Sequence, residues 1–447
     1  MNIRRLVVAA AVFFILAGVL YWSEHHQPSQ EAGKVSPDTP PVILKLDESA
    51  ITKLDLKRKD VDPVVLTKGD AGKWRIVEPK PFDADQNTVA AIVTAVSSLS
   101  AQRLVDDHTA DLKQYGLDPP AFELDVSERD NKTQKLLIGD ETTASGAVYV
   151  KLADDSRVFT MPKYMKTSLD KSLNDLRDKR LLTIDPEKVS RIELAHTTKN
   201  QDIEFGRNKE EWQITKPRPM RADGVQVSEL LRKLTDAKMD LSASDNIDAA
   251  KEFAKATLVA IVRVTDESGT QELQVRKAGK ERDKAAYYAK SSAVDGAYKV
   301  DSELGQSLDK SLDEFRNKKL FDFGYEEPNK IELHDGSKAY FLSRSGADWW
   351  ANGKKMDAEN VQGLISKLRD LSAEKFPDSG FTTSTITVFV TSNDGKRTEN
   401  VLIAKSGDVY LAKRESEPAL YQLTASAVDD LTKAAEAIKP AAAAPAK

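Results

Sequence analysis

The five histidines are the first residues to examine for chemistry, because imidazole is the usual general base near neutral pH. They are His25, His26, His108, His196 and His334. His25 and His26 are adjacent and could contact a metal ion, but no third ligand stands near them in the sequence. The other three are isolated and lack the His-x-x-x-His or Glu-x-x-His spacing of a metal site. We therefore expect no metal ion and no cofactor, and we interpret the pair as part of a solvated linker.

Other catalytic patterns are missing as well. The sequence has no Walker A loop, no Gly-x-Gly-x-x-Gly after a strand and no Gly-x-Ser-x-Gly elbow. It has no cysteine, which excludes disulfides, thiolate metal sites and cysteine nucleophiles. Ser168 and Lys171 have the spacing seen in some serine acyltransferases, but Ser307 and Lys310 repeat it inside a similar helical pattern. An active site is rarely duplicated together with its helix, so the sequence predicts a protein that is not an enzyme.

Composition narrows the class of protein. Of the 447 residues, 31% are charged and 40% are hydrophobic, which is typical of a globular chain rather than a disordered one. The net charge is −5 at pH 7, whereas general binding of nucleic acid needs a basic surface. We therefore expect no nucleic-acid partner.

The N-terminus resembles a membrane anchor. An uncharged run from Leu6 to Trp22 follows Arg4 and Arg5. As a helix it spans about 25 Å, near the lower limit for crossing a bilayer. Basic residues before such a run stay in the cytoplasm. We expect residues 1–22 to form a cytoplasmic stub and a single transmembrane helix, with the rest outside the cytoplasm; a cleaved signal peptide is the alternative.

Two stretches of thirteen residues share a pattern of tryptophan, proline and Ala-Asp. Residues 73–85 read KWRIVEPKPFDAD, and residues 211–223 read EWQITKPRPMRAD. The shared positions are Trp74, Pro79 and Asp85 in the first stretch, Trp212, Pro217 and Asp223 in the second, and Trp349 and Asp357 in a degraded third copy without the proline. Such tryptophans could stack on sugars, but the isoleucine two positions after each of the first two favours a half-buried strand.

Each of the three aspartates precedes a helical pattern. Apolar residues stand 4, 7, 8 and 11 positions after Asp85, Asp223 and Asp357, which places them on one stripe of a helix. The carboxylates could be catalytic. Their position before a periodic run is more typical of an N-cap, whose side chain accepts hydrogen bonds from N–H groups of the first turn. We therefore expect these aspartates to cap helices.

Two further markers recur along the chain. The first is an apolar-acidic-apolar triplet that predicts a strand, and it occurs as Leu54-Asp55-Leu56, Ile192-Glu193-Leu194 and Ile331-Glu332-Leu333. The second is a closing run at 168–182 and 307–321, with nine of fifteen residues identical, which we interpret as an amphipathic helix with a solvated basic end. Alternating runs with turn residues between these markers predict hairpins.

Together the markers predict an α+β fold. It consists of an N-terminal transmembrane helix followed by three repeated domains, each ordered strands, helix, strands, helix, with largely antiparallel sheets. The expected boundaries are a linker at 23–41, repeat domains at 42–183, 184–321 and 322–438, and a disordered tail at 439–447.

The markers resemble a bacterial family, the domain-of-unknown-function family 4340. Beyond the tryptophan stretch, the first repeat carries the family's later positions, which are Tyr115, Gly116, Gly139 and Tyr149. The second repeat lacks the Tyr-Gly-Leu turn, and the third keeps only the general pattern. The resemblance implies a single-pass protein of the bacterial inner membrane with its bulk in the periplasm, often encoded beside ABC-2-type and gliding-motility-type transporter components. It implies no activity.

We therefore expect a non-catalytic, membrane-anchored scaffold or accessory protein outside the cytoplasm. Its expected partners are the inner membrane, through residues Leu6 to Trp22, and envelope proteins, with ABC transporter subunits among the candidates. The alternative is a module that binds envelope polymer, glycan or peptidoglycan, in grooves between the repeats. An enzyme is the least favoured alternative.

Overall fold

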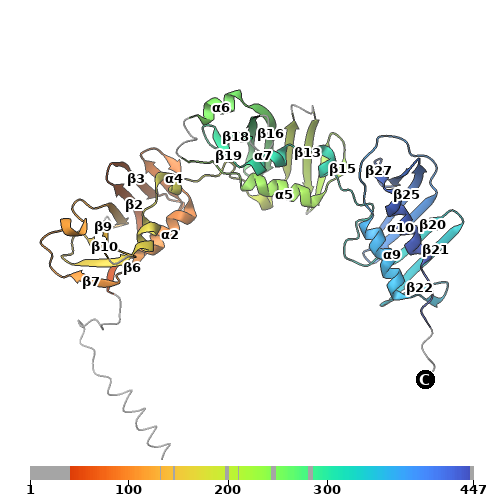
Figure 1. Cartoon of the computed structure of the whole chain (residues 1–447), viewed down its shortest axis with the longest axis horizontal. Coiled ribbons are helices and arrows are strands. Elements are labelled where there is room, and N and C mark those ends of the chain that lie inside the picture. Colours follow the sequence, from red (N-terminus) through yellow and green to blue (C-terminus); the bar gives the residue numbers. More distant parts are fainter. Residues whose placement is uncertain are drawn as a thin grey trace, which may run out of the picture. The chain divides into compact units, whose positions relative to one another are not determined.

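The chain folds into a series of antiparallel sheets (Figure 1). The computed structural model describes residues 41–442 except 131, 144–145, 197–200, 210, 243–247 and 280–284. The chain divides after Asp178 into two compact units. The first unit contains one large sheet and a small two-stranded one, and the second unit contains two large sheets.

The predicted fold class is corrected to a mostly β fold. Strands account for 45% of the described residues and helices for 22%. The reason lies in the alternating runs, which form eight or nine strands in each large sheet. The helices are few and short by comparison, and each large sheet is packed against only a small set of them.

The predicted transmembrane anchor and inner-membrane location are also corrected. Among the helices that lie in the described parts of the chain, none is long and apolar enough to cross a membrane. The longest of them, α9 (Ala358–Asp370), has 13 residues, whereas a spanning helix needs about 20. The predicted anchor from Leu6 to Trp22 lies outside the described residues, as do His25 and His26.

The first sheet has nine strands in the order β5-β4-β3-β2-β8-β9-β10-β11-β7. Their bounds are β2 (Ile51–Arg58), β3 (Val61–Lys68), β4 (Trp74–Glu78), β5 (Phe82–Asp83), β7 (Arg103–Asp106), β8 (Phe122–Glu128), β9 (Thr133–Glu141), β10 (Ala147–Leu152) and β11 (Val158–Pro162). A separate pair joins β1 (Val42–Lys45) to β6 (Ser98–Ser100). The helices in the described part of this unit are α2 (Gln86–Ser97), η1 (Lys113–Tyr115), α3 (Lys163–Leu169) and α4 (Leu173–Leu176).

The second sheet has eight strands in the order β15-β14-β13-β12-β16-β17-β18-β19. Their bounds are β12 (Arg191–His196), β13 (Gln201–Asn208), β14 (Glu211–Lys216), β15 (Met220–Arg221), β16 (Thr257–Asp266), β17 (Gly269–Ala278), β18 (Ala286–Ser291) and β19 (Tyr298–Val300). Its helices are η2 (Pro186–Lys188), α5 (Gly224–Thr235), α6 (Ala249–Lys255), α7 (Ser302–Leu308) and α8 (Leu312–Phe315).

The third sheet repeats the same order as β23-β22-β21-β20-β24-β25-β26-β27. Its strands are β20 (Lys330–Asp335), β21 (Lys338–Ser345), β22 (Asp348–Ala351), β23 (Lys354–Lys355), β24 (Ile386–Ser392), β25 (Arg397–Ser406), β26 (Val409–Arg414) and β27 (Leu420–Leu423). Helices α9 and α10 (Ala425–Glu436) pack on it. In all three sheets the strand that carries the apolar-acidic-apolar triplet is central. It pairs with the next strand of the chain on one side and with β8, β16 or β24 on the other.

In each repeat a capping aspartate links the helix that follows it, which we call the core helix, to the end of the repeat. Asp85, Asp223 and Asp357 are the N-caps of α2, α5 and α9, so this prediction is confirmed. Their side chains accept hydrogen bonds from N–H groups of the first helical turn. Their own backbone N–H groups donate to the carbonyls of Leu176, Phe315 and Lys439, at 2.8, 2.8 and 2.9 Å. The start of the core helix is therefore bonded to the end of the same repeat.

The closing runs differ from the single helix that their apolar spacing predicts. Each begins with the last two residues of one short helix, α3 or α7, and contains a second, α4 or α8. The second helix begins at a capping box formed by Ser172 with Asp175, and by Ser311 with Glu314. A serine that binds the third residue of a new helix ends the previous one. The basic ends are extended rather than helical, since Asn317 donates its N–H to Arg221 O and Lys319 bridges Ser372.

Removing the cap at Asp223 should weaken α5 locally. Its carboxylate accepts from Val225 N at 3.0 Å and Gln226 N at 3.2 Å. We expect Asp223→Ala to lower the opening free energy of the first turn of α5 by about 1 kcal/mol. Asp223→Asn, which keeps an acceptor oxygen, should stay close to the wild type. Hydrogen exchange of α5 peptides measures this difference, and equal protection in the alanine variant would contradict the capping role.

Candidate functional site

The three tryptophans of the repeated pattern lie in the cores of their sheets. Trp74, Trp212 and Trp349 are only 6%, 7% and 4% exposed. Gln86, the first residue of α2, accepts from Trp74 N at 2.8 Å and donates to Trp74 O at 2.9 Å, and so fixes the helix to β4. Buried rings cannot stack on a ligand from solution. These residues therefore hold a strand against a helix.

The Tyr-Gly-Leu turn of the first repeat is pressed against strand β9. Gly116 has φ 63°, and a Cβ atom there would lie 2.3 Å from Cγ of Asp140. A Cβ atom on Gly139 would lie 2.1 Å from the carbonyl oxygen of Tyr115. Both glycines are thus required by one close approach of two backbones. The turn therefore packs on β9, and it leaves the Tyr115 side chain near the surface.

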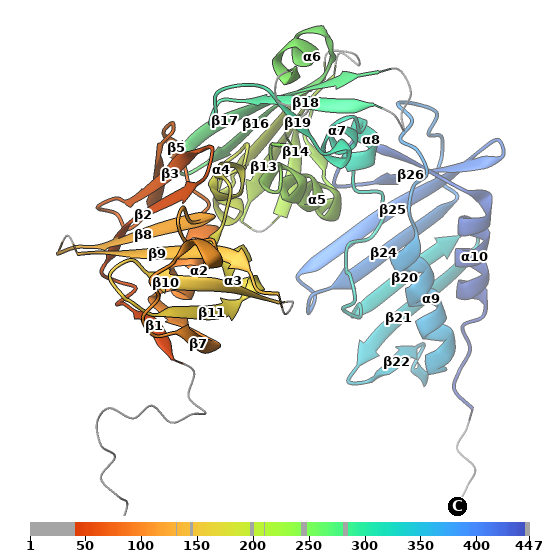
Figure 2. The same cartoon turned by 60° about the vertical axis from the view of Figure 1, so that its left-hand side comes forward.

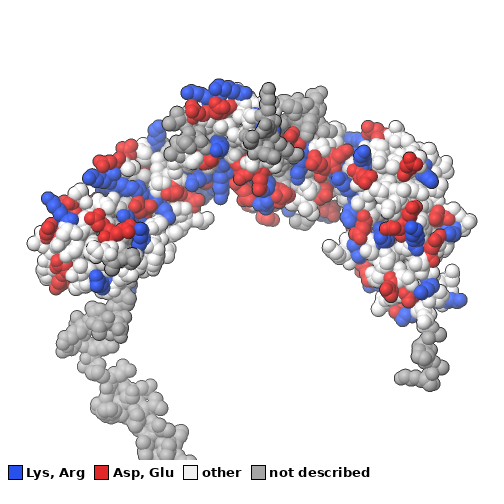
Figure 3. Space-filling view, in the orientation of Figure 1, with Lys and Arg blue, Asp and Glu red and all other residues white. Residues whose placement is uncertain are grey.

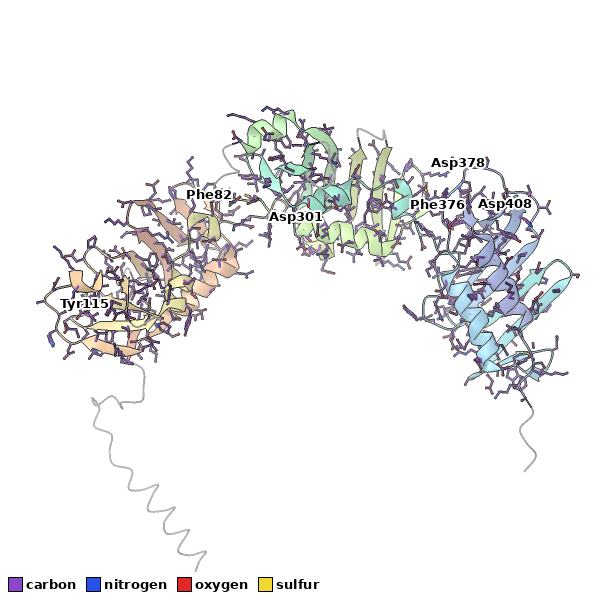
Figure 4. All side chains as sticks on the ribbon, in the orientation of Figure 1. Phe82, Tyr115, Asp301, Phe376, Asp378 and Asp408 are labelled. Atoms are coloured by element: carbon purple, nitrogen blue, oxygen red, sulfur yellow. The ribbon has the colours of Figure 1, made fainter. Side chains whose placement is uncertain are left out.

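Tyr115 itself takes part in a small polar cluster (Figure 4). Its hydroxyl donates to Asp106 at 3.2 Å, and its ring centroid lies 4.9 Å from that of Tyr149. Burial and the bond to Asp106 raise the pKa of the Tyr115 phenol above its ordinary value. The phenol therefore stays protonated at neutral pH and acts as a hydrogen-bond donor.

The prolines of the repeated pattern shape the turns that follow the tryptophan strands. Pro79 lies between β4 and β5, and Pro217 lies between β14 and β15. Both follow a cis peptide bond. They contribute to the turn and bring no reactive group.

The densest buried cluster of charges was not predicted from the sequence. It lies in the second unit, and Arg221 at the end of β15 is its centre. Arg221 donates through Nε to Glu417 and through Nη2 to the hydroxyl of Tyr421, both at 2.9 Å, and forms an ion pair with Asp322. Arg221 belongs to the second sheet, whereas Glu417 and Tyr421 belong to the third repeat. The cluster therefore ties two repeats of this unit together.

Arg414 extends this cluster into the third repeat. It donates through Nη2 to Glu399 at 2.9 Å and through Nη1 to the carbonyl oxygen of Leu320 at 2.6 Å. Glu399 and Arg414 are each 5% exposed. Glu399 also accepts from the backbone N–H of Asp322 at 3.1 Å. Buried charges are tolerated only when they are paired in this way, and such pairs favour one arrangement of the parts they join.

Burial and ion pairing shift the pKa values of two groups in the cluster. Burial alone would lower the pKa of Arg221, but the contacts with Tyr421, Asp322 and Glu417 outweigh it and raise that pKa. Burial raises the pKa of Tyr421 to about 12, with Arg221 opposing the shift and Glu417 adding to it. Neither group can act as a base near neutral pH. The arrangement is better suited to holding the second and third repeats together than to catalysis.

A stacked arginine completes the junction. The guanidinium carbon of Arg316 lies 3.5 Å from the ring centroid of Phe376, which Figure 4 labels. In the first unit Arg177, at the matching position, lies 3.9 Å from the ring centroid of Phe82. The identity of these two arginines across the closing runs was the one sequence signal for this role. Their aromatic partners lie too far away in the sequence to be recognised.

Each unit also contains a cavity within its described residues. A cavity of about 350 Å³ in the first unit is lined by Arg58, Val61, Asp62, Val64, Pro79, Ser172 and Leu173. One of about 300 Å³ in the second unit is lined by Arg232, Lys233, Asp236, Ala237, Lys238, Asp301, Glu303 and Leu304. Within the parts of the chain that the structure describes, no group of three His, Asp or Glu side chains could hold a metal ion. Basic and acidic side chains are interspersed over the surface seen in Figure 3.

Comparison with known families gives one result. A family model described as "Domain of unknown function (DUF4340)" matches residues 74–211 and 212–388. The chain belongs to this family. Each DUF4340 match begins on a tryptophan, Trp74 in one and Trp212 in the other. No curated protein and no solved structure matches the chain.

The DUF4340 pattern can now be stated in structural terms. Its tryptophan fills the core, its aspartate caps the core helix, and its two glycines let a turn lie on β9. The second repeat lacks that turn and has α6 between the core helix and β16 instead. The family pattern therefore describes how the repeat folds and contains no group of reacting side chains.

Adding one methyl group at Gly139 should destabilise the first unit. The new Cβ atom would meet the Tyr115 carbonyl oxygen, so strand and turn must separate. We expect Gly139→Ala to lower the opening free energy of the first sheet by about 1–3 kcal/mol. Gly69→Ala is the matched control, because its Cβ atom would meet nothing closer than Lys73 O at 3.6 Å. Hydrogen exchange of β9 and β10 peptides reports the difference, and equal protection in both variants would refute the close-approach argument.

Tyr421 should make the second unit sensitive to alkaline pH. The folded state raises the pKa of this phenol from 10.0 to about 12 and so keeps a proton that the unfolded chain loses. This contribution is complete below pH 10.0 and is lost as pH rises through about 12. We expect the free energy of urea unfolding to fall by about 2–3 kcal/mol over that range because of this group.

The comparison that isolates this effect is between two tyrosine-to-phenylalanine variants. Tyr421→Phe should show a shallower fall in stability between pH 10 and 12 than the wild type. Tyr325→Phe, at a side chain that is 96% exposed, should follow the wild type. If all three proteins lose stability with the same slope, the phenol is not linked to folding.

Proposed function

We propose that the chain is a non-catalytic scaffold or accessory protein that holds one or more protein partners. The observation that supports this most directly is the use of the repeated residues. Tryptophan, proline, aspartate and glycine of the family pattern serve cores, turns and caps in every repeat where they occur. When all the motif residues of a repeat stabilise its fold, the motif supports a role in binding partners at the surface rather than a catalytic role.

The junction in the second unit fits a scaffold for a second reason. Arg221, Asp322, Glu399, Arg414 and Glu417 bind each other and leave no charged group of the cluster unpaired. Beside them, Arg316 pairs with Ala222 of the second repeat, and Lys319 pairs with Ser372 of the third. A scaffold benefits from repeats that keep a fixed arrangement, because surfaces on neighbouring repeats can then be recognised together.

Subunits of ABC-type transporters are the partner class that we propose. This part rests on the family resemblance, since members are often encoded beside such components. The alternative, a glycan-binding module that uses Trp74 and Trp212 in grooves between repeats, loses its main argument. Those two rings are 6% and 7% exposed and lie in separate cores.

Cross-linking followed by affinity purification tests the scaffold proposal. The full chain would carry a C-terminal tag and a photo-reactive amino acid at Tyr325 or Val225, which are 96% and 75% exposed. We expect a specific protein to be captured in near-stoichiometric amount and to be identified as a transporter component by mass spectrometry. A chain with the same photo-reactive residue but no tag is the control for background.

Two results would contradict the proposal in different ways. Recovery of the tagged chain alone from both positions would argue against a scaffold. Capture of one specific protein unrelated to transport would keep the scaffold and reject the transporter as its partner class.

A further inference from the structure

The third sheet covers one face with helices and leaves the other open. Helices α9 and α10 pack side by side over Leu333, Val388 and Val401 (Figures 1 and 2). Because side chains alternate along a strand, the residues between those core positions point to the opposite face. We call this the open face. Its side chains include Lys330, Glu332, His334, Phe341, Ser343, Trp350, Thr387, Phe389, Thr391, Asn400 and Leu402, with Lys355, Leu411 and Lys413 at its margins.

The central row of the open face differs from the matching rows of the other two sheets. The rows read Val65–Asp55–Asp125 in the first sheet, Glu204–Glu193–Arg263 in the second and Phe341–Glu332–Phe389 in the third. In the first sheet Lys57 Nζ lies 2.7 Å from Asp125, and in the second Arg263 Nη1 lies 3.6 Å from Glu193. Cross-strand ion pairs of this kind suit a surface that faces water. The third sheet places two aromatic rings there instead.

These rings form an apolar surface that the protein itself does not cover. Phe341 is 47% exposed and Trp350, on the neighbouring strand and diagonal to it, is 37% exposed. Elsewhere on this face the chain does cover an apolar side chain, since Leu411 on β26 lies under Gly380 and is 4% exposed. A contiguous exposed apolar surface is unfavourable in water and usually marks a binding surface.

One polar group beside the rings lacks a partner of its own. Asn400 stands next to Phe389 in the row, and its Oδ1 atom is shielded from water without a hydrogen bond. An unpaired acceptor in such a position costs about 1–3 kcal/mol. A ligand hydroxyl group would satisfy Asn400 after a small rotation of its side chain.

Charge at the centre of the open face is paired. Lys330 and Glu332 form an ion pair, so the carboxylate between the two phenylalanines is not left to attract a cation. His334 contacts Phe341 edge-on, with ring centroids 5.3 Å apart. At the margin of the face Lys355 pairs with Asp348 at 2.9 Å, and Lys413 lies opposite Leu402. The centre of the face therefore presents aromatic rings and an amide, and a ligand that matches it is uncharged, has apolar faces and carries hydroxyl groups.

We propose that the open face of the third sheet binds an uncharged carbohydrate chain. Sugar rings stack their C–H faces on aromatic rings and exchange hydrogen bonds through their hydroxyls. Phe341 and Phe389 are two strands apart, a separation of about 10 Å that is on the scale of one disaccharide unit. This proposal goes beyond the scaffold role and does not depend on it.

Binding of defined oligosaccharides to the purified full chain tests the proposal. The probes are maltoheptaose, cellohexaose and chitohexaose, measured by isothermal calorimetry and by quenching of tryptophan fluorescence. We expect at least one probe to bind, and Phe341→Ala or Asn400→Ala to weaken that binding by about tenfold or more. Phe341→Trp should retain it, because a larger ring still offers a stacking face. Tyr325→Ala, which removes an aromatic ring that is 96% exposed outside this face, should bind within about twofold of the wild type.

Three outcomes would overturn the proposal. The first is that none of the three probes binds to the wild-type chain. The second is that a probe binds but Phe341→Ala and Asn400→Ala, shown by hydrogen exchange to be folded, bind it as tightly as the wild type. The third is that the wild type forms a dimer in solution that Phe341→Glu dissociates, which would assign the face to a second copy of the chain. Capture of a protein partner elsewhere on the chain bears only on the scaffold role.

Discussion

The backbone N–H of the capping aspartate is the point on which each repeat depends. Through its side chain the aspartate starts the core helix, and in the first two repeats its N–H binds the middle of the closing run, some ninety residues later. The residue before it, Ala84 or Ala222, pairs with the arginine of the closing run, Arg177 or Arg316. The tryptophan strand lies directly before this point. Strand, helix and closing run are therefore held together where the sequence pattern is strongest.

This arrangement explains which features could be predicted from the sequence. Caps, strands and hairpins depend on neighbouring residues, so Asp85 and the alternating run of β24 could be recognised from local pattern alone. The closing run was predicted as one helix because Leu169, Leu173 and Leu176 fit helical spacing. The break between them depends on Ser172, whose hydroxyl and N–H bind Asp175. Periodicity does not register such a competing hydrogen bond.

The charged junction depends on residues that are distant in the chain. Arg221 and Tyr421 are separated by 200 positions, and Arg221 stands where the first repeat has Asp83. A local sequence pattern cannot indicate a partner so far away. Comparison of the repeats does not reveal Arg221 either, because only the second repeat has an arginine at this position. The exposure of Phe341 and Trp350 could not be predicted for another reason. Alternation shows that a strand has two faces, but it does not show which face stays uncovered. The transmembrane anchor was inferred from the apolar run Leu6 to Trp22 and the two arginines before it, and these residues lie outside the described part of the chain. Repetition thus reveals the buried half of each sheet, whereas the differences between repeats lie on the other half.

The segment from Arg316 to Leu320 is bonded to two repeats at once. Arg316 forms an isolated bridge with Ala222 at its start, and Leu320 donates its N–H to the Leu371 carbonyl at its end, with a distance of 3.0 Å. These five residues leave a short connection between the second and third repeats. Tension applied along the chain would therefore load the hydrogen bonds at both ends of the segment before it could lengthen.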